Sequence, residues 1–192
     1  MKTRLTLFFI VVASFFVQAQ NTEACTETLS LMSTSVKAKD VTAYDYLTTL
    51  RKDCPSFHKS IYSLGEFAVK LKIEKATTPQ DKEKYVRDLL KLYDEHDQYF
   101  PNNGAGNKMK KGLALFENKI GTSDEVFQLL DVAFKTDYAN CKYAKAMYVY
   151  FEILVNNHKA NKGVELQQVF DKYDDISKKL DEEEKELSEE ND

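Results

Sequence analysis

The sequence contains little of the material that builds turns, disulfide networks or many short strands. Its 192 residues include six glycines, three prolines, three cysteines and no tryptophan. Three cysteines are too few for a disulfide-dense fold, and a hydrophobic content of 43% excludes collagen-like and wholly disordered chains. Scarce glycine and proline leave few turns for a many-stranded β protein, so long helices are favoured. The length fits one domain with a continuous core.

An excess of positive charge is also lacking: 31 acids stand against 27 bases, and the acidic excess lies at one end of the chain. The formal net charge is −4, and the segment from Asp171 onward holds 11 acids against 4 bases. The chain therefore has no basic stripe of the kind that nucleic-acid binding requires. For the same reason, binding to an anionic membrane surface is unfavourable. No nucleic-acid or membrane partner is expected.

The first residues have the pattern of a secretory signal peptide. Lys2 and Arg4 precede an apolar run over residues 5–17, and Val17-Gln18-Ala19 fits a cleavage site after Ala19. The alternatives are a membrane anchor and a lipid anchor at Cys25. A 13-residue helix rises only ~20 Å, which is too short to span a hydrocarbon core of ~30 Å. We expect residues 1–19 to be removed and the protein to be exported, periplasmic or secreted, with no membrane span after cleavage.

The rest of the chain shows helical periodicity. Cys25, Leu29, Met32 and Val36 recur at the spacing of one helix face. Comparable stripes predict further helices over residues 43–54, 57–71, 79–100, 109–120, 123–134, 144–155 and from 163 into the acidic end. No stretch sustains the alternation of period two that marks a strand. The sequence therefore predicts an all-α fold.

Local signals mark where several of these helices begin and end. Thr78-Pro79-Gln80-Asp81 combines an N-cap threonine, a proline at the first helical position and an acid at the third. Thr122 and Glu125 form a capping box, Pro55 stops the second helix, and Gly121 is expected to end the fifth.

Two-helix units recur along the chain. They begin near residues 23, 57, 107 and 141, at intervals of 34, 50 and 34 residues, and 34 residues is the period of the tetratricopeptide repeat. Residues 23–187 resemble a degenerate array of this family, with two departures. Leu31 stands where the family prefers a small residue, and the large aromatic residue near each repeat start is missing. The matching positions are Lys39–Ala43 with Leu47, Leu50 and Pro55; Ile61, Leu64 and Gly65 with Tyr93 and Phe100–Asn103; and Lys111–Gly112 with Gly121.

The resemblance implies an exported bacterial protein whose antiparallel helical hairpins stack over residues 20–180 as a right-handed solenoid. Its concave groove, lined by the first helix of each hairpin, would bind an extended peptide or a helix of a partner protein. Tyr62, Phe67 and Tyr150 lie off the main stripes of their helices and are candidate partner-binding residues, unless they pack against a neighbouring repeat. An ordinary helical bundle with coincidental spacing remains the alternative fold.

Candidate chemistry is sparse. His58, His96 and His158 share no metal-ligand spacing, and Asp94–Asp97 is interpreted as a solvated helix end because consecutive residues point around a helix. Gly104–Lys108 lacks the ending of a phosphate-binding loop. We therefore expect no catalytic residue, metal or cofactor, and a protein-interaction or scaffold module of the cell envelope. The alternatives are an extracytoplasmic enzyme or small-ligand carrier with a pocket between helices, and a structural spacer.

The last helix carries apolar residues at heptad positions, interrupted by Glu183. One interpretation is a cap over the last hairpin, and the other is a short coiled coil that joins two chains. Residues 181–192 are expected to be an acidic tail or a fraying helix end. The heptad residues are Leu166, Val169, Tyr173, Ile176, Leu180 and Leu187.

A disulfide is expected between Cys25 and Cys54. The first inter-helix turn centres near Lys39, which lies 14 residues after one cysteine and 15 before the other, so antiparallel helices bring both to the same level. Cys141 would remain a free thiol. The alternative is that Cys25 and Cys54 are simply small buried residues.

Overall fold

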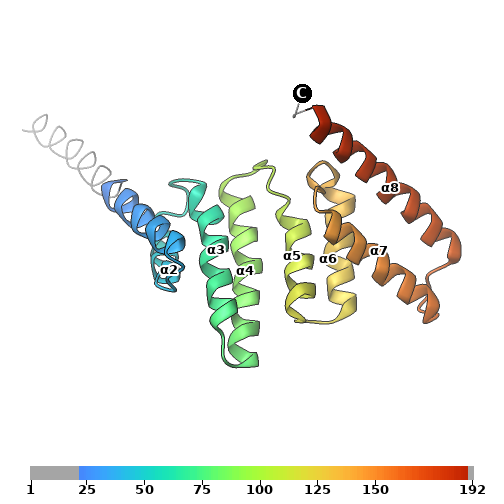
Figure 1. Ribbon diagram of the computed structural model, residues 1–192, viewed down its shortest axis with the longest axis horizontal. Coiled ribbons are helices and arrows are strands. Elements are labelled where there is room, and N and C mark those ends of the chain that lie inside the picture. The colour runs from blue at the N-terminus through green and yellow to red at the C-terminus, as the bar shows by residue number, and fades with distance from the viewer. Residues whose placement is uncertain (1–21, 190–192) are drawn as a thin grey trace, which may run out of the picture. The chain divides into compact units, whose positions relative to one another are not determined.

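A computed structural model describes residues 22–189 of the chain, and every regular element in that range is helical (Figure 1). The predicted signal peptide over 1–19 lies outside the described residues. The all-α prediction is confirmed for the described part of the chain. The elements are a helix over 22–37, α2 (Ala43–Asp53), α3 (Ser60–Lys75), α4 (Pro79–Tyr99), α5 (Asn107–Asn118), α6 (Ser123–Thr136), the short 3-10 helix η1 (Tyr138–Asn140), α7 (Ala144–Lys159) and α8 (Leu166–Glu189).

The chain divides into two compact units, and the division falls inside α4. Among the described residues, the first unit comprises those up to Asp88 together with Gln98–Pro101, and the second comprises Leu89–Asp97 and those from Asn102 onward. The expected single repeat domain over 20–180 remains a prediction.

The core of the first unit forms where the 22–37 helix, α2 and α3 bury their apolar stripes. Met32, Leu47, Leu50 and Ile61 have no exposed surface. The predicted disulfide is confirmed: it links Cys25 to Cys54, with 6.1 Å between the two Cα atoms. The bond ties the start of the 22–37 helix to the residue that caps α2.

A half-buried carboxylate holds α4 against α2. The Asp88 carboxylate accepts a hydrogen bond from the Tyr44 hydroxyl at 2.9 Å and two from the Arg51 guanidinium at 2.9 and 3.0 Å. Burial, and then the neighbouring Asp88 charge, raise the pKa of Tyr44 above its usual range, so this hydroxyl remains a donor.

The predicted helix starts are confirmed, and one predicted end is wrong. The Thr78 and Thr122 hydroxyls accept the N–H groups of Asp81 and Glu125, each at 3.1 Å. However, α5 ends at Asn118, before Gly121, because Lys119 adopts the left-handed conformation with φ 58° and its N–H bonds back to the helix carbonyls. The sequence pointed to glycine because glycine is the usual residue in that conformation.

The second unit is built around the close approach of α5 and α6. A Cβ atom at Gly112 would lie 2.6 Å from the Leu130 side chain, which is fully buried, so glycine is required at this contact. α7 packs on α5 and α6, and α8 packs on α7. α8 continues through the acidic end to Glu189, so residues 181–189 are helical, whereas 190–192 lie outside the described part.

Candidate functional site

The turn that follows the disulfide borders a hollow in the first unit. The Phe57 N–H bonds to the Cys54 carbonyl at 3.0 Å, and the Tyr62 hydroxyl donates to the Pro55 carbonyl at 2.9 Å. These two bonds fold residues 54–59 into a tight connection between α2 and α3. The connection holds Phe57 and His58 opposite the 22–37 helix.

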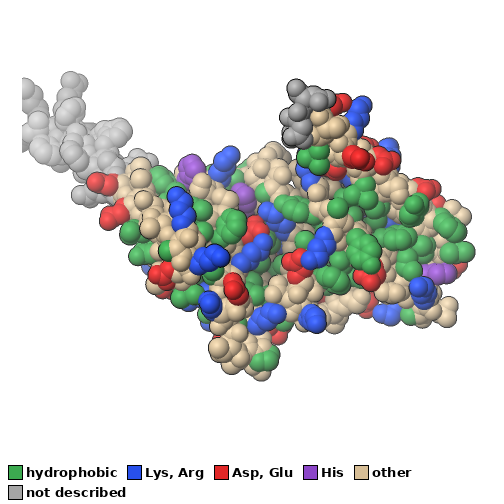
Figure 2. All heavy atoms as spheres, viewed as in Figure 1, with side chains coloured by type: hydrophobic (Ala, Val, Ile, Leu, Met, Phe, Trp, Pro, Cys, Tyr) green, Lys and Arg blue, Asp and Glu red, His purple; other side chains and the backbone are tan. Residues whose placement is uncertain are grey.

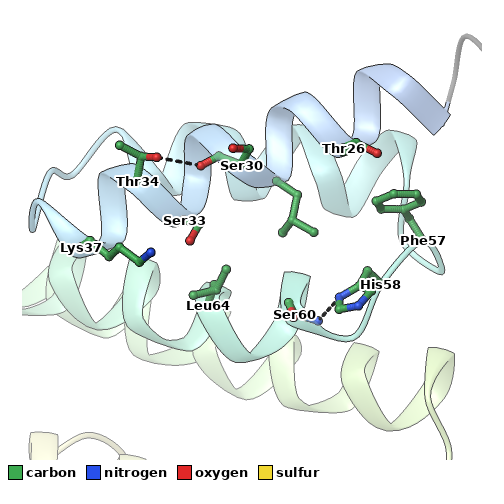
Figure 3. A pocket seen from close by; sticks show the side chains of 10 residues that line it. Thr26, Ser30, Ser33, Thr34, Lys37, Phe57, His58, Ser60 and Leu64 are labelled. Carbon is green, nitrogen blue, oxygen red and sulfur yellow. Dashed lines mark hydrogen bonds between the residues drawn. The ribbon is translucent and has the colours of Figure 1, made fainter.

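Between that helix and the start of α3 lies a groove of about 490 Å³ that is open to solvent. We call it the serine–threonine groove. Figure 3 shows Lys37 at one end and Phe57 and His58 at the other, with Ser33 and Leu64 facing each other between them. Its lining residues are Thr26, Leu29, Ser30, Ser33, Thr34, Lys37, Phe57, His58, Ser60 and Leu64.

Five of the lining side chains form one polar face of the 22–37 helix. Positions 26, 30, 33, 34 and 37 follow helical spacing, so their side chains share one side of it. The Thr26 and Thr34 hydroxyls donate to the carbonyls of Thr22 and Ser30, at 2.8 and 3.0 Å. Because each hydroxyl oxygen has two acceptor lone pairs, these threonines still accept hydrogen bonds from a ligand.

The groove carries two nitrogen groups and no carboxylate among its ten lining residues. The Nδ1 atom of His58 accepts the Ser60 N–H at 3.1 Å, so in the neutral ring Nε2 carries the proton and is a donor. Lys37 is exposed and forms no ion pair within the described residues. These two nitrogen groups therefore suit a hydrogen-bond acceptor or an anion as the ligand.

The three residues expected to bind a partner lie elsewhere. Tyr62 and Tyr150 are 2% and 1% exposed, so the expectation of surface exposure is wrong for both, and the alternative of packing inside the fold describes them. Phe67 is 58% exposed on α3, and its role in partner binding stays a prediction. None of the three lines the serine–threonine groove.

Tyr150 is held inside the second unit by a hydrogen bond that its periodicity could not reveal. Its hydroxyl donates to Asp131 at 2.6 Å, and burial, together with this bond, raises the pKa of Tyr150 above its usual range. Burial pushes the pKa of Asp131 upward, but hydrogen bonds from Lys135 and Tyr150 outweigh it, so that pKa lies below its usual value. This pair fixes α7 to α6 and belongs to the core.

The polar run at the end of α4 is less solvated than expected. His96 is only 8% exposed, and its Nδ1 atom lies 3.1 Å from the Asn107 amide nitrogen. Asp97 accepts hydrogen bonds from Asn103 and Asn107 at 2.9 and 2.7 Å. The interpretation as a solvated helix end is therefore wrong for His96, because α5 folds back over it. Within residues 22–189, no three His, Cys, Asp or Glu side chains gather as metal ligands.

Sequence reasoning missed the serine–threonine groove because a polar helix face is usually read as solvent-facing. The available signal was five hydroxyl and amino side chains on one face of the 22–37 helix, next to the stripe that carries the disulfide cysteine. That pattern distinguishes this face from the mixed charges on the other exposed helices.

Comparison with known proteins adds no relative to these observations. No helix among the described residues is both long and apolar enough to cross a membrane. No protein-family model, curated protein or solved structure matches the chain.

Proposed function

We propose that the protein is an interaction module that binds an extended segment of a partner protein in the serine–threonine groove. The observation that carries this proposal is an open groove lined by hydroxyl groups and a lysine, with no acid among its lining residues. We further propose that the module acts outside the cytoplasm. The signal-peptide pattern and the Cys25–Cys54 disulfide support that location, since such bonds persist in oxidising compartments.

The dimensions of the groove favour a peptide over a small molecule. Thr26 and Lys37 are 11 residues apart on one helix face, which corresponds to about 16 Å of helix. An extended chain advances ~3.3 Å per residue, so about five residues of a partner would span the groove. Small-molecule sites typically enclose most of their ligand, whereas this groove is open to solvent.

Charge and polarity specify the partner segment. Lys37 at one end is complementary to an aspartate, a glutamate or a terminal carboxylate, and the hydroxyls between the two ends offer hydrogen bonds to a backbone. Phe57 supplies apolar surface at the other end (Figure 3), and Leu29, about two helical turns before Lys37, adds to it. We therefore propose that the partner segment carries an acidic group three or four residues away from an apolar side chain.

The wider architecture is consistent with a tetratricopeptide-like array, which remains part of the proposal. The 22–37 helix and α3 are the first helices of successive hairpins, and in such arrays the first helices line the binding surface. The enzyme alternative gains no support from this site. Its two titratable groups, Lys37 and His58, stand at opposite ends of the groove, with Ser33 and Leu64 between them (Figure 3).

The test is binding of synthetic heptapeptides to the purified exported protein, with acidic and apolar residues placed at varied spacing. Peptides with an acid three or four residues from an apolar side chain are expected to bind best. Lys37→Glu should lower the affinity for these peptides at least about threefold, because an attraction of ~0.5–1 kcal/mol between the lysine and the acid becomes a repulsion.

The matched control is Lys52→Glu, which makes the same charge change at an α2 side chain that is 82% exposed and outside the groove. Binding should be unchanged in that variant. Equal affinity for basic and acidic peptides, or equal effects of the two substitutions, would contradict the proposal. Chemical shift changes confined to residues outside the groove would contradict it as well.

A further inference from the structure

α8 carries apolar side chains on two faces, one buried against its own unit and the other largely exposed. Val169, Ile176 and the stem of Lys179 are buried. The Lys172 and Lys179 ammonium groups lie over the rings of Phe134 and Tyr138, at 4.7 and 4.9 Å from the ring centres. These contacts complete the packing of α8 against its own unit.

The second face consists of large apolar side chains that remain exposed. We call it the α8 stripe. Its members are Leu166 (52% exposed), Phe170 (56%), Tyr173 (57%), Leu180 (38%) and Leu187 (59%). The structure thus separates the predicted heptad into buried positions (Val169, Ile176) and exposed ones. A helix that served only as a cap would need the first set alone, since end helices of a repeat stack require a polar outer face.

The α8 stripe has the spacing of one of the two apolar positions in a coiled-coil heptad. Leu166, Tyr173, Leu180 and Leu187 follow one another at intervals of seven residues. An α-helix has about 3.6 residues per turn, so side chains seven residues apart shift slowly around a straight helix. Two such helices keep these side chains in contact by winding around each other. The 21 residues from first to last span about 31 Å.

The surface beside the stripe is apolar as well. The Tyr173 ring lies 5.9 Å from the ring of Phe151 on α7, and Tyr148, one turn earlier on α7, is 63% exposed. Figure 2 shows hydrophobic side chains gathered over the α7–α8 hairpin. With about half of five large side chains exposed, the α8 stripe offers roughly 500 Å² per chain, or about 1,000 Å² for two copies, which reaches the lower end of specific interfaces.

We propose that the α8 stripe pairs with the α8 stripe of a second copy of this chain in an antiparallel arrangement. Charge determines the orientation. Residues 181–189 carry six acids and one lysine, a net −5, whereas residues 166–173 carry Asp171 and Lys172, a net charge of zero. Parallel helices would place two strongly acidic ends together, and antiparallel helices place each acidic end against a neutral one.

The antiparallel arrangement also aligns the seam. With the two-fold axis between Ile176 and Ser177, Leu166 of one copy faces Leu187 of the other, and Tyr173 faces Leu180. All four heptad positions are then covered by apolar partners. The proposal is independent of the serine–threonine groove, so either can fail without the other.

Sedimentation equilibrium of the exported protein tests the pairing, and we expect a dimer with a Kd of about 1–100 μM. Leu166→Lys and Leu187→Glu should each weaken the dimer at least about tenfold, because each places a charge against leucine. The double variant should recover to within about threefold of the parent, since antiparallel helices bring each new lysine opposite a new glutamate.

Ser188→Glu is the matched control, because it adds the same residue one position away from the stripe on an exposed side chain, and its Kd should equal the parent's. Circular dichroism of every variant checks that α8 still folds. A monomer at millimolar concentration would overturn the proposal. A double variant weaker than both single variants, or a Ser188→Glu variant as weak as Leu187→Glu, would overturn it as well.

Discussion

Replacing Cys25 and Cys54 together by alanine is expected to lower the free energy of unfolding by about 3–4 kcal/mol. The bond closes a loop with a sequence separation of 29 residues. In the chain-entropy relation, closing a loop of that length lowers the conformational entropy of the unfolded chain by about 12 cal/mol/K. This corresponds to a free energy of about 3.6 kcal/mol at 298 K. For a protein of this size, that corresponds to a fall in melting temperature of roughly 7–14 °C.

The loss should be greatest at the 22–37 helix. Beyond the disulfide, its deepest anchor is the fully buried Met32, and the Ser35 hydroxyl receives only a long 3.5 Å hydrogen bond from Thr42. Its backbone amides should therefore exchange faster in the alanine variant, while amides of α5 and α6 in the second unit retain their protection. The serine–threonine groove should lose peptide binding in parallel, because one of its walls is this helix.

The assay is urea denaturation with and without a reducing agent, combined with hydrogen exchange. Reductant should destabilise the parent and leave the double alanine variant unchanged, which separates loss of the bond from any effect of the reagent. An unaltered midpoint in the reduced parent would refute the entropic reasoning. Unaltered exchange over residues 22–37 would refute the claim that the bond holds this helix in place.

Other outcomes follow from the second unit. Gly112→Ala should destabilise by up to about 2 kcal/mol in a thermal melt, since a clash with buried Leu130 costs ~1–3 kcal/mol and the gain in helix propensity offsets only ~1 kcal/mol of it. Asp131 has a lowered pKa when folded, so its stabilisation is present above about pH 4 and is lost as the pH falls through the folded value. Asp131→Asn should accordingly flatten the acid limb of a plot of unfolding free energy against pH. Burial raises the pKa of Cys141 to about 11, so its thiol should resist iodoacetamide at pH 8.5 until the protein unfolds.

The helices and their starts could be predicted because the signals are local. Thr78 and Thr122 lie next to the N–H groups that they cap, and an apolar stripe such as Cys25 to Val36 determines one face of its own helix. The disulfide was also within reach, since a short turn makes the two helices antiparallel and brings the cysteines to one level.

The serine–threonine groove and the burial of two tyrosines depended on contacts between distant residues. Tyr150 is buried where its hydroxyl donates a hydrogen bond to Asp131, 19 residues earlier, and Tyr62 is buried where its ring stacks on Tyr99, with 6.2 Å between the ring centres. Periodicity assigns a face to each residue and does not identify the partner that satisfies a polar atom on that face. The heptad predicted for α8 likewise combined residues from both apolar faces. Sequence spacing alone does not show which of these residues pack against the rest of the unit.

The division inside α4 restricts how this chain could arise by recombination. Arrays of helical hairpins usually gain or lose members by breaks in the loops between them, where an exchanged piece brings its own complete helices. Here a piece that ended at the division would end in mid-helix, between Asp88 and Leu89, and the end of α4 with the residues after it, Gln98–Pro101, belongs to the first unit again. A piece exchanged at the loops on either side of α4 would therefore carry residues of both units.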